Sequence, residues 1–324
     1  MNYKVSVVIP VYGVEKYIER CARSLFEQTL DEIEYIFVDD CSQDKSIEIL
    51  EKVASEYPKR KQDFSIIHHA QNLGLAAARV TGLSHCHGEY VIQCDSDDWI
   101  DKDTYREMYS KAKKNNADVV ICDFFSSDGK VNKKITITHP TERLEWIKDM
   151  FYHKTSWALW NKLFKRSLYH NNITYPKYSM GEDSVVVMQL AYFCNTIVYT
   201  DLPLYYYFNN PNSIVNSKME DKRYQKFIEA LDNCKIIERF YKEERKQTLK
   251  NCINFLYYYT KNTLLLPLIW KEKYKEIWCR TFPGIEREIL KDSHISSKER
   301  IRCLLIILKI YPRITNTLGL TKCK

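Results

Sequence analysis

Acidic residues follow two of the strands that the sequence predicts. Asp39 and Asp40 end one apolar run, and Asp95, Asp97 and Asp98 follow another. In open α/β sheets the ligand lies beyond the carboxyl ends of the strands, so we expect these carboxylates to converge on one edge. Their mutual repulsion would be costly unless a positive charge lay between them. Carboxylate oxygens suit Mg²⁺ or Mn²⁺, with water and substrate phosphates completing the coordination.

Each acidic group also has a structural interpretation. Asp and Ser accept hydrogen bonds from the first N–H groups of a helix, so the segment 95–98 could cap the helix that follows it. Asp39 and Asp40 could form a turn or an N-cap before a helix expected near residue 43. The residues alone leave both interpretations open.

Apolar, β-branched runs alternate with stretches of helical period through the first 125 residues. The strand candidates are Val5–Pro10, Tyr35–Asp39, Phe64–His68, Tyr90–Cys94 and Val119–Cys122, and helices are expected near 15–28, 43–57, 73–84 and 102–115. Continuous hydrophobicity in the first two runs indicates strands covered on both faces. The sequence therefore predicts an α/β fold with a mostly parallel sheet flanked by helices in a domain 1–217, followed by a helical C-terminal region 218–324.

Composition excludes several classes of protein. The 324 residues are 45% hydrophobic and 28% charged, which is typical of a globular chain with a core. Only 8 are Gly, and neither G-x-x-x-x-G-K-[ST] nor G-x-G-x-x-G occurs. The 11 Cys include no C-x-x-C pair, which indicates reduced thiols. No signal-peptide pattern and no apolar run of ~18 residues is present, so we expect a cytoplasmic chain.

Charge is unevenly distributed, with a net +11 for residues 218–324 and −4 for residues 1–217. The runs Phe255–Tyr259 and Ile301–Tyr311 in the basic part fit either peripheral contact with an anionic membrane, on its inner face, or ordinary helix packing. No nucleic-acid-binding motif accompanies the charge, so we expect no nucleic acid as partner. The oligomeric state is left open.

A set of short motifs runs through the chain in order. They are Pro10-Val11-Tyr12, Val38-Asp39-Asp40-x-Ser42-x-Asp44, Asn72-Leu73-Gly74 with Arg79, Gly88-Glu89-Tyr90, Asp95-Ser96-Asp97-Asp98-Trp99, Trp160-Asn161-Lys162, Gly181-Glu182-Asp183, Tyr205-Tyr206-Tyr207 and Ser213-Ile214. This set resembles the family-2 glycosyltransferases of the GT-A (Rossmann-like) fold, most closely over residues 4–125. The resemblance implies a metal-dependent, inverting transfer of a sugar from a nucleoside-diphosphate donor, UDP-sugar above all. The acceptor would be a hydroxyl of a saccharide or lipid-linked saccharide in bacterial cell-surface polysaccharide synthesis.

The resemblance also implies roles for single residues on the donor side. Pro10 and Tyr12 would border the nucleobase, Asp40 would accept the uracil N3–H, and Asp39 would bind ribose or hold the turn. Arg79 would supply positive charge to phosphate oxygens. Without the motif, Arg79 would be taken for a solvated helix residue and Tyr12 for a core residue. The implied nucleotide-sugar-binding residues are Pro10, Tyr12, Asp39, Asp40, Asn72, Arg79, Asp95, Ser96 and Asp97.

Metal and acceptor roles follow in the same way. Asp95 and Asp97 resemble the family's D-x-D pair, and the metal ligands implied are Asp97, Asp95 and Asp98, holding Mn²⁺ or Mg²⁺. Asp183 resembles the catalytic base that takes the acceptor proton, with Glu182 as a supporting or acceptor-binding group. Both could instead cap the next helix.

Trp160 and Lys162 resemble an acceptor-binding W-x-K segment, for which a buried structural Trp is the alternative. Three residues depart from the family pattern: Gly13 stands where many members have Asn, Cys41 where many have Gly, and Phe208 where many have Arg. The last change keeps a catalytically silent sugar-nucleotide-binding protein open as an alternative. A sugar nucleotidyltransferase is a second alternative, although the loop after the first strand lacks the Gly and basic residues that it needs.

Overall fold

The computed structural model describes residues 3–210, 220–245 and 248–308. Within these residues the chain forms two compact units. The first holds residues 3–147 and 155–210, and the second holds 148–154, 220–245 and 248–308. The predicted boundary between residues 217 and 218 lies outside the described residues, as do the Ser213-Ile214 motif and the end of the run Ile301–Tyr311.

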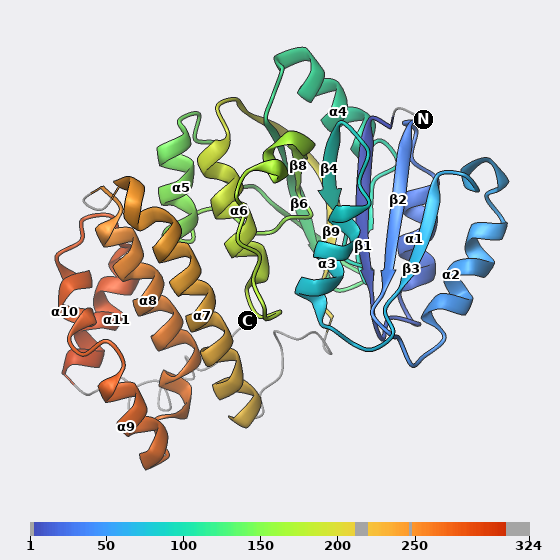
Figure 1. Cartoon of the computed structure of the whole chain (residues 1–324). Helices are drawn as coiled ribbons and strands as arrows, with labels where there is room; N and C mark the ends of the chain where they lie inside the picture. The colour runs from blue at the N-terminus through green and yellow to red at the C-terminus, as the bar shows by residue number, and fades with distance from the viewer. Residues whose placement is uncertain (1–2, 211–219, 246–247, 309–324) are drawn as a thin grey trace. The chain divides into compact units, whose positions relative to one another are not determined.

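Four parallel strands form the first half of the sheet, in the spatial order β3-β2-β1-β4 (Figure 1). They are β1 (Val5–Val11), β2 (Ile33–Asp39), β3 (Phe64–His68) and β4 (Tyr90–Gln93). Every residue of β1 and β2 is buried, because helices cover both faces, as the continuous apolar runs predict. These strands end at the edge where the acidic residues lie.

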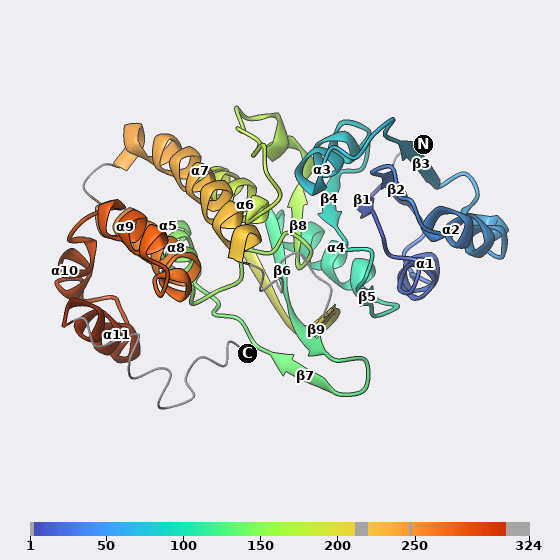
Figure 2. The same ribbon diagram turned by 90° about the horizontal axis from the view of Figure 1, so that it is seen from below.

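Helices pack on the two faces of this half (Figure 2). They are α1 (Ile18–Phe26), α2 (Ser46–Ser55), α3 (Leu75–Ser84) and α4 (Thr104–Asn115). Apolar residues of α1, α2 and α4 share one core with Val5, Val7 and Ile9, whereas Ala78 of α3 packs on Val8 from the opposite face. At Gly82 the helix α3 approaches so closely that a Cβ would overlap the Val8 side chain.

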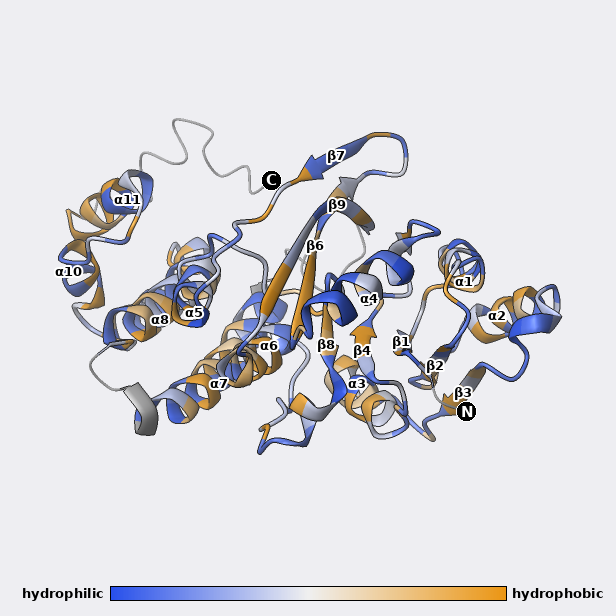
Figure 3. Cartoon of the chain, turned by 90° about the horizontal axis from the view of Figure 1, so that it is seen from above, coloured by the Kyte–Doolittle hydropathy of each residue, from blue (hydrophilic) through white to orange (hydrophobic). Residues whose placement is uncertain are grey.

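The second half of the sheet mixes strand directions. It contains β5 (Trp99–Ile100), β6 (Val119–Ser127), β7 (Asn132–Ile135), β8 (Lys162–Lys165) and β9 (Ile197–Phe208), with α5 (Arg143–Phe151) and α6 (Glu182–Phe193) in the connections. β8 runs antiparallel to β4 and β6, while β6 and β9 are parallel. Hydrophobic residues concentrate along β4, β6 and β8 (Figure 3). The predicted α/β sheet is therefore confirmed, but its continuous run of parallel strands ends at β4, where the antiparallel β8 follows.

The second unit is helical. Besides residues 148–154 it contains α7 (Glu220–Arg245), α8 (Lys250–Leu264), α9 (Glu272–Arg280), α10 (Ile285–Leu290) and α11 (Ser297–Ile307). Phe255, Leu256, Tyr257 and Tyr258 are buried in this unit, so the interpretation that their run contacts a membrane is wrong. Among the described residues, no helix is long and apolar enough to span a membrane.

Candidate functional site

A buried guanidinium joins the predicted donor side to the predicted base. The Nε of Arg79, on α3, donates to Glu182 Oε1 at 2.7 Å, and its Nη2 donates to Asp95 Oδ1 at 2.9 Å. Asp183 Oδ1 lies 3.4 Å from the same Nη2. Arg79 is only 4% exposed, so the interpretation as a solvated helix residue is wrong. With these donors directed at protein groups, the guanidinium faces carboxylates and not an open phosphate site.

The ionisation of these groups is set by burial and by one another. Burial by itself lowers the pKa of Arg79, but Glu182, Asp183 and Asp95 together raise it well above its usual value. The pKa of Asp95 is raised to about 6, mainly by burial. Arg79 acts to lower this pKa, and the Asp183 and Asp97 carboxylates act to raise it. Burial likewise raises the pKa of Glu182.

Asp183 lies in the first turn of α6, after Gly181 in the left-handed conformation with φ 76°. Its Oδ2 accepts the backbone N–H of Leu159 at 3.3 Å, and its side chain is 22% exposed. Gly181 is the N-cap residue of α6, so Glu182 and Asp183 are its first two helical residues and not the N-cap. A partly exposed carboxylate at a helix start, beside a buried cation, suits a group that accepts a proton from a bound hydroxyl.

The Asp95–Asp98 segment splits into exposed and buried carboxylates. Asp95 and Asp97 are partly exposed, and Asp97 Oδ2 accepts Nδ2 of Asn210 at 2.8 Å. Asp98 is 0% exposed, and its two oxygens accept the Tyr205 hydroxyl at 2.6 Å and the Phe208 backbone N–H at 2.7 Å. This position argues against the metal role predicted for Asp98, which instead ties the loop to β9.

Two partly exposed carboxylates fit a divalent cation that takes its other ligands from water and a diphosphate. The described residues contain no group of three or more His, Cys, Asp or Glu arranged to hold a metal by themselves. Ser96, between Asp95 and Asp97, is 6% exposed and therefore offers little surface to a ligand. The donor set thus fits Mg²⁺ or Mn²⁺ bound together with substrate.

Asp40, at the end of β2, holds the loop before α3. Its Oδ1 accepts the N–H of Leu73 and Nδ1 of His69, both at 2.8 Å, and its Oδ2 accepts the N–H of Gly74 at 2.8 Å. A carboxylate has about four acceptor positions, so one position on Oδ2 remains beyond these three contacts. Asp40 is only 3% exposed, so this position does not lie at the surface of the free protein.

Asp39 forms the turn that was one of its two interpretations, because its Oδ1 accepts the N–H of Ser42 at 2.8 Å. Its Oδ2 lies 2.9 Å from Nδ1 of His68. Cys41 stands in this turn with φ 60°, a left-handed conformation that favours Gly. No role was predicted for His68 or His69, although His68 ends a predicted strand on the same edge and His69 follows it.

The first loop and Asn72 are placed on the surface. Tyr12 is 53% exposed, so the interpretation as a core residue is wrong, and Pro10 is buried within β1. Asn72 is exposed beside Leu73, itself 49% exposed. Tyr12 and Asn72 therefore have surface available for a ligand, whereas Pro10 shapes the strand end.

The residues predicted to bind the acceptor are buried. Trp160 is 6% exposed and stacks on Tyr205, with ring centroids 4.3 Å apart. The ammonium of Lys162 donates to the carbonyls of Ser156 and Ala158 at 2.9 and 2.7 Å. Burial lowers the pKa of Lys162 to about 7. The structural alternative therefore describes both residues better than direct contact with an acceptor.

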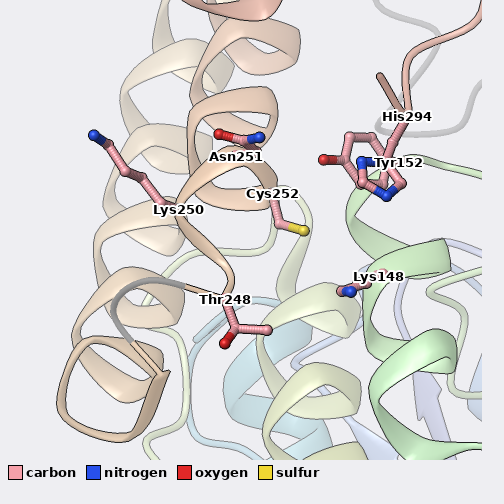
Figure 4. Close-up of a pocket in the computed structure, with 7 residues that line it drawn as sticks. All are labelled: Lys148, Tyr152, Thr248, Lys250, Asn251, Cys252 and His294. Atoms are coloured by element: carbon pink, nitrogen blue, oxygen red, sulfur yellow. The ribbon is translucent and has the colours of Figure 1, made fainter. Parts of the chain in front are cut away.

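A separate pocket of about 350 Å³ lies in the second unit (Figure 4). It is lined by Lys148, Tyr152, Thr248, Lys250, Asn251, Cys252 and His294. Tyr152 and His294 both contact the Asp292 carboxylate, at 2.6 and 3.0 Å. None of the residues predicted from the sequence lines this pocket, so it is not part of the candidate site.

Known proteins share both the sequence and the fold. Residues 6–179 match the family model described as glycosyl transferase family 2. The chain is 36% identical over 231 residues to the putative glycosyltransferase EpsH of Bacillus subtilis (strain 168), a match that covers 68% of this chain and 64% of EpsH. The matched part therefore spans less than two thirds of that relative.

Solved structures resemble the chain over most of its length. S. aureus TarS 1-349 in complex with UDP has a TM-score of 0.62 and 21% identity, covering 98% of this chain and 92% of TarS. The mannosyltransferase PcManGT from Pyrobaculum calidifontis, in complex with GDP-Man and Mn²⁺, has a TM-score of 0.56 and 14% identity, covering 100% of this chain and 89% of PcManGT. These likenesses confirm the predicted GT-A fold with a helical C-terminal region. The family match covers more than half of the chain, and the chain therefore belongs to glycosyl transferase family 2.

Proposed function

We propose that the chain transfers a sugar from a UDP-sugar to a hydroxyl of a saccharide or lipid-linked saccharide in cell-surface polysaccharide synthesis. The observation that carries the proposal is the grouping of Asp95 and Asp183 around Arg79, because it brings the donor edge of the sheet beside a candidate base. Family membership and the UDP complex of TarS support a nucleotide-sugar donor.

On the donor side, Asp97 and Asp95 would hold Mn²⁺ or Mg²⁺. The ion would stabilise the negative charge on the departing nucleoside diphosphate. Asp40 would accept the uracil N3–H at its remaining acceptor position, although it is only 3% exposed in the free protein. The exposed ring of Tyr12 offers a flat face to the base. Arg79 would act through Asp95, which it orients, and not through direct contact with phosphate.

On the acceptor side, Asp183 would take the proton of the attacking hydroxyl. The acceptor oxygen then bonds to the anomeric carbon while the bond from that carbon to the diphosphate oxygen breaks, so the configuration inverts. Glu182 accepts a hydrogen bond from Arg79 through Oε1 and would support α6 without touching the reacting atoms. Trp160 and Lys162 would shape the acceptor side from beneath the surface.

The proposal is tested by release of UDP from a panel of UDP-sugars, with oligosaccharide acceptors and Mn²⁺. We expect at least one UDP-sugar to be consumed by the wild type and not by Asp97→Ala. Asp201→Asn is the matched control, since the Asp201 side chain is 84% exposed and distant in sequence from every proposed ligand. Binding without turnover of any donor would favour the silent alternative, and release of pyrophosphate from UTP and a sugar 1-phosphate would favour a nucleotidyltransferase.

We also propose peripheral contact between the second unit and an anionic leaflet, on the cytoplasmic side. Ile301 and Leu304 of α11 are 58% and 46% exposed, and Leu308, just after the helix, is 62% exposed. The net charge of +11 over residues 218–324 would favour anionic lipid. Flotation with phosphatidylglycerol vesicles tests it: the wild type should float, Leu304→Glu should not, and equal flotation of both would contradict this contact.

A further inference from the structure

A second arginine lies beside the acidic segment, and no role has been given to it above. Arg20 is on α1, and its Nη2 donates to the backbone carbonyl of Asp97 at 2.9 Å. Asp97 is therefore held at two points, because its carboxylate also accepts Nδ2 of Asn210. These two contacts fix both the backbone and the side chain of a proposed metal ligand.

Two aromatic rings hold this guanidinium in place. The Cζ of Arg20 lies 3.6 Å from the ring centroid of Trp99 and 5.0 Å from that of Phe208. Trp99 pairs with Tyr206 of β9, and the Phe208 ring packs on Tyr17 of the segment before α1, so both rings are fixed by the fold. Such contacts give a cation a defined position and orientation.

Packing alone does not account for an arginine here. The Nε of Arg20 is buried, and no hydrogen-bond partner for it exists among the described residues. Burial lowers the pKa of Arg20, and the Asp98 and Asp97 carboxylates only partly oppose this shift. A guanidinium stays charged in proteins, so the fold accepts a desolvation cost to keep a positive charge at this edge.

We propose that Arg20 is a positioning residue for the divalent cation. It holds the Asp97 carbonyl, so that the Asp97 carboxylate is in place before the ion and diphosphate arrive, and its charge offsets the repulsion between Asp97 and Asp98. Phe208 contributes by packing its ring against the Arg20 guanidinium. The inference rests on the proposed function, because it assumes that Asp97 binds a metal.

The test is the Mn²⁺ affinity of the UDP-bound protein, measured by electron paramagnetic resonance, for the full chain. We expect Arg20→Met to raise the Kd for Mn²⁺ about tenfold or more, because the variant loses one hydrogen bond from a charged donor. Arg20→Lys keeps the charge and a donor, and should recover most of the affinity. At saturating Mn²⁺, UDP binding by both variants should match that of the wild type.

Arg23→Met is the matched control. Arg23 lies one turn further along α1 and pairs with Glu19 and Glu56 on the surface, so its loss should leave Mn²⁺ affinity unchanged. If Arg20→Met does not fold, Phe208→Leu replaces it, because this variant removes one ring from the guanidinium and should weaken Mn²⁺ binding severalfold.

Two results would overturn the inference, and they are distinguishable. Wild-type Mn²⁺ affinity in Arg20→Met, or in Phe208→Leu if that variant is needed, would show that Arg20 only packs, and would leave the proposed function intact. A wild-type protein that binds UDP equally with and without Mn²⁺ would overturn both the role of Arg20 and the metal dependence on which it rests.

Discussion

Arg79 and Glu182 form a buried ion pair between α3 and α6, with 2.7 Å between Nε and Oε1. Both side chains are about 5% exposed or less. The same guanidinium binds Asp95, so one cation connects the end of β4 to the first turn of α6. The proposed metal edge and the proposed base are thus held by a shared group, and a change at Arg79 should affect both.

Loss of Arg79 should be strongly destabilising. Arg79→Met leaves buried carboxylates without their cation, for which we expect a loss of about 3–5 kcal/mol in the free energy of unfolding. Denaturant unfolding measures it, with Arg106→Met as the control because the Arg106 side chain is 46% exposed. Equal stability of Arg79→Met and the wild type would show that Asp95, Glu182 and Asp183 do not need the charge of Arg79.

Asp183→Asn should abolish transfer while leaving the donor site intact. The amide keeps the size of the side chain and cannot take a proton, so we expect kcat to fall about 10²–10⁴-fold. Steady-state kinetics give kcat, and calorimetry of UDP with Mn²⁺ gives the donor affinity, which should match the wild type. Glu182→Gln serves as the comparison, because it should lower the free energy of unfolding and have only a small effect on kcat. Retention of full kcat by Asp183→Asn would require another base.

Asp97 and Asp98 should respond in opposite ways to the same substitution. Asp97→Asn should weaken Mn²⁺ binding and leave stability within about 0.5 kcal/mol of the wild type. Asp98→Asn should keep Mn²⁺ binding but cost about 1–3 kcal/mol, because the amide oxygen can accept only one of the hydrogen bonds that Tyr205 and Phe208 donate, and the amide nitrogen cannot accept the other. Unfolding and Mn²⁺ titration of both variants decide the point. The reverse pattern would restore Asp98 as the metal ligand.

Lys162 should give stability a distinct dependence on pH. Its pKa is lowered to about 7 in the folded chain, against about 10.4 when unfolded. Between these values the unfolded chain binds a proton that the folded chain does not, so stability rises with pH, by at most about 1.4 kcal/mol per pH unit. Below pH 7 both states are protonated and this contribution is constant.

The difference in unfolding free energy between the wild type and Lys162→Met isolates this contribution. Denaturant unfolding at pH 6, 7, 8 and 9 should show the wild type gaining stability over the variant as the pH rises above 7. Parallel pH profiles for the two proteins would mean that Lys162 keeps its proton in the folded state.

Local sequence patterns were enough to predict the first strands of the sheet and the acidic residues that follow them. The continuous apolar runs predict β1 and β2 because both faces of these strands are covered, and the acidic residues after β4 lie where the sheet edge requires. The antiparallel β8 and the long β9 escaped prediction because their pairing depends on partners far away in sequence. Strand direction is a property of the whole chain and not of a local pattern.

Side-chain exposure within a motif was equally unpredictable. Adjacent Asp97 and Asp98 have the same chemistry, and only the pairing of β5 with β9 brings the Tyr205 hydroxyl to one of them. Lysine is rarely buried, and the burial of Lys162 depends on loop carbonyls that accept its hydrogen bonds. No periodic pattern in the sequence predicts these contacts. Arg20 was missed because a single arginine on an amphipathic helix is usually solvated.

Calorimetric titration of UDP with Mn²⁺, with EDTA, and with the Asp97→Ala variant tests the central claim most directly. The account predicts binding that requires Mn²⁺ and that disappears in Asp97→Ala, while the Asp201→Asn control binds as the wild type does. No binding of UDP by the wild type under any metal condition would contradict the donor assignment, and with it the role of Asp40 toward uracil.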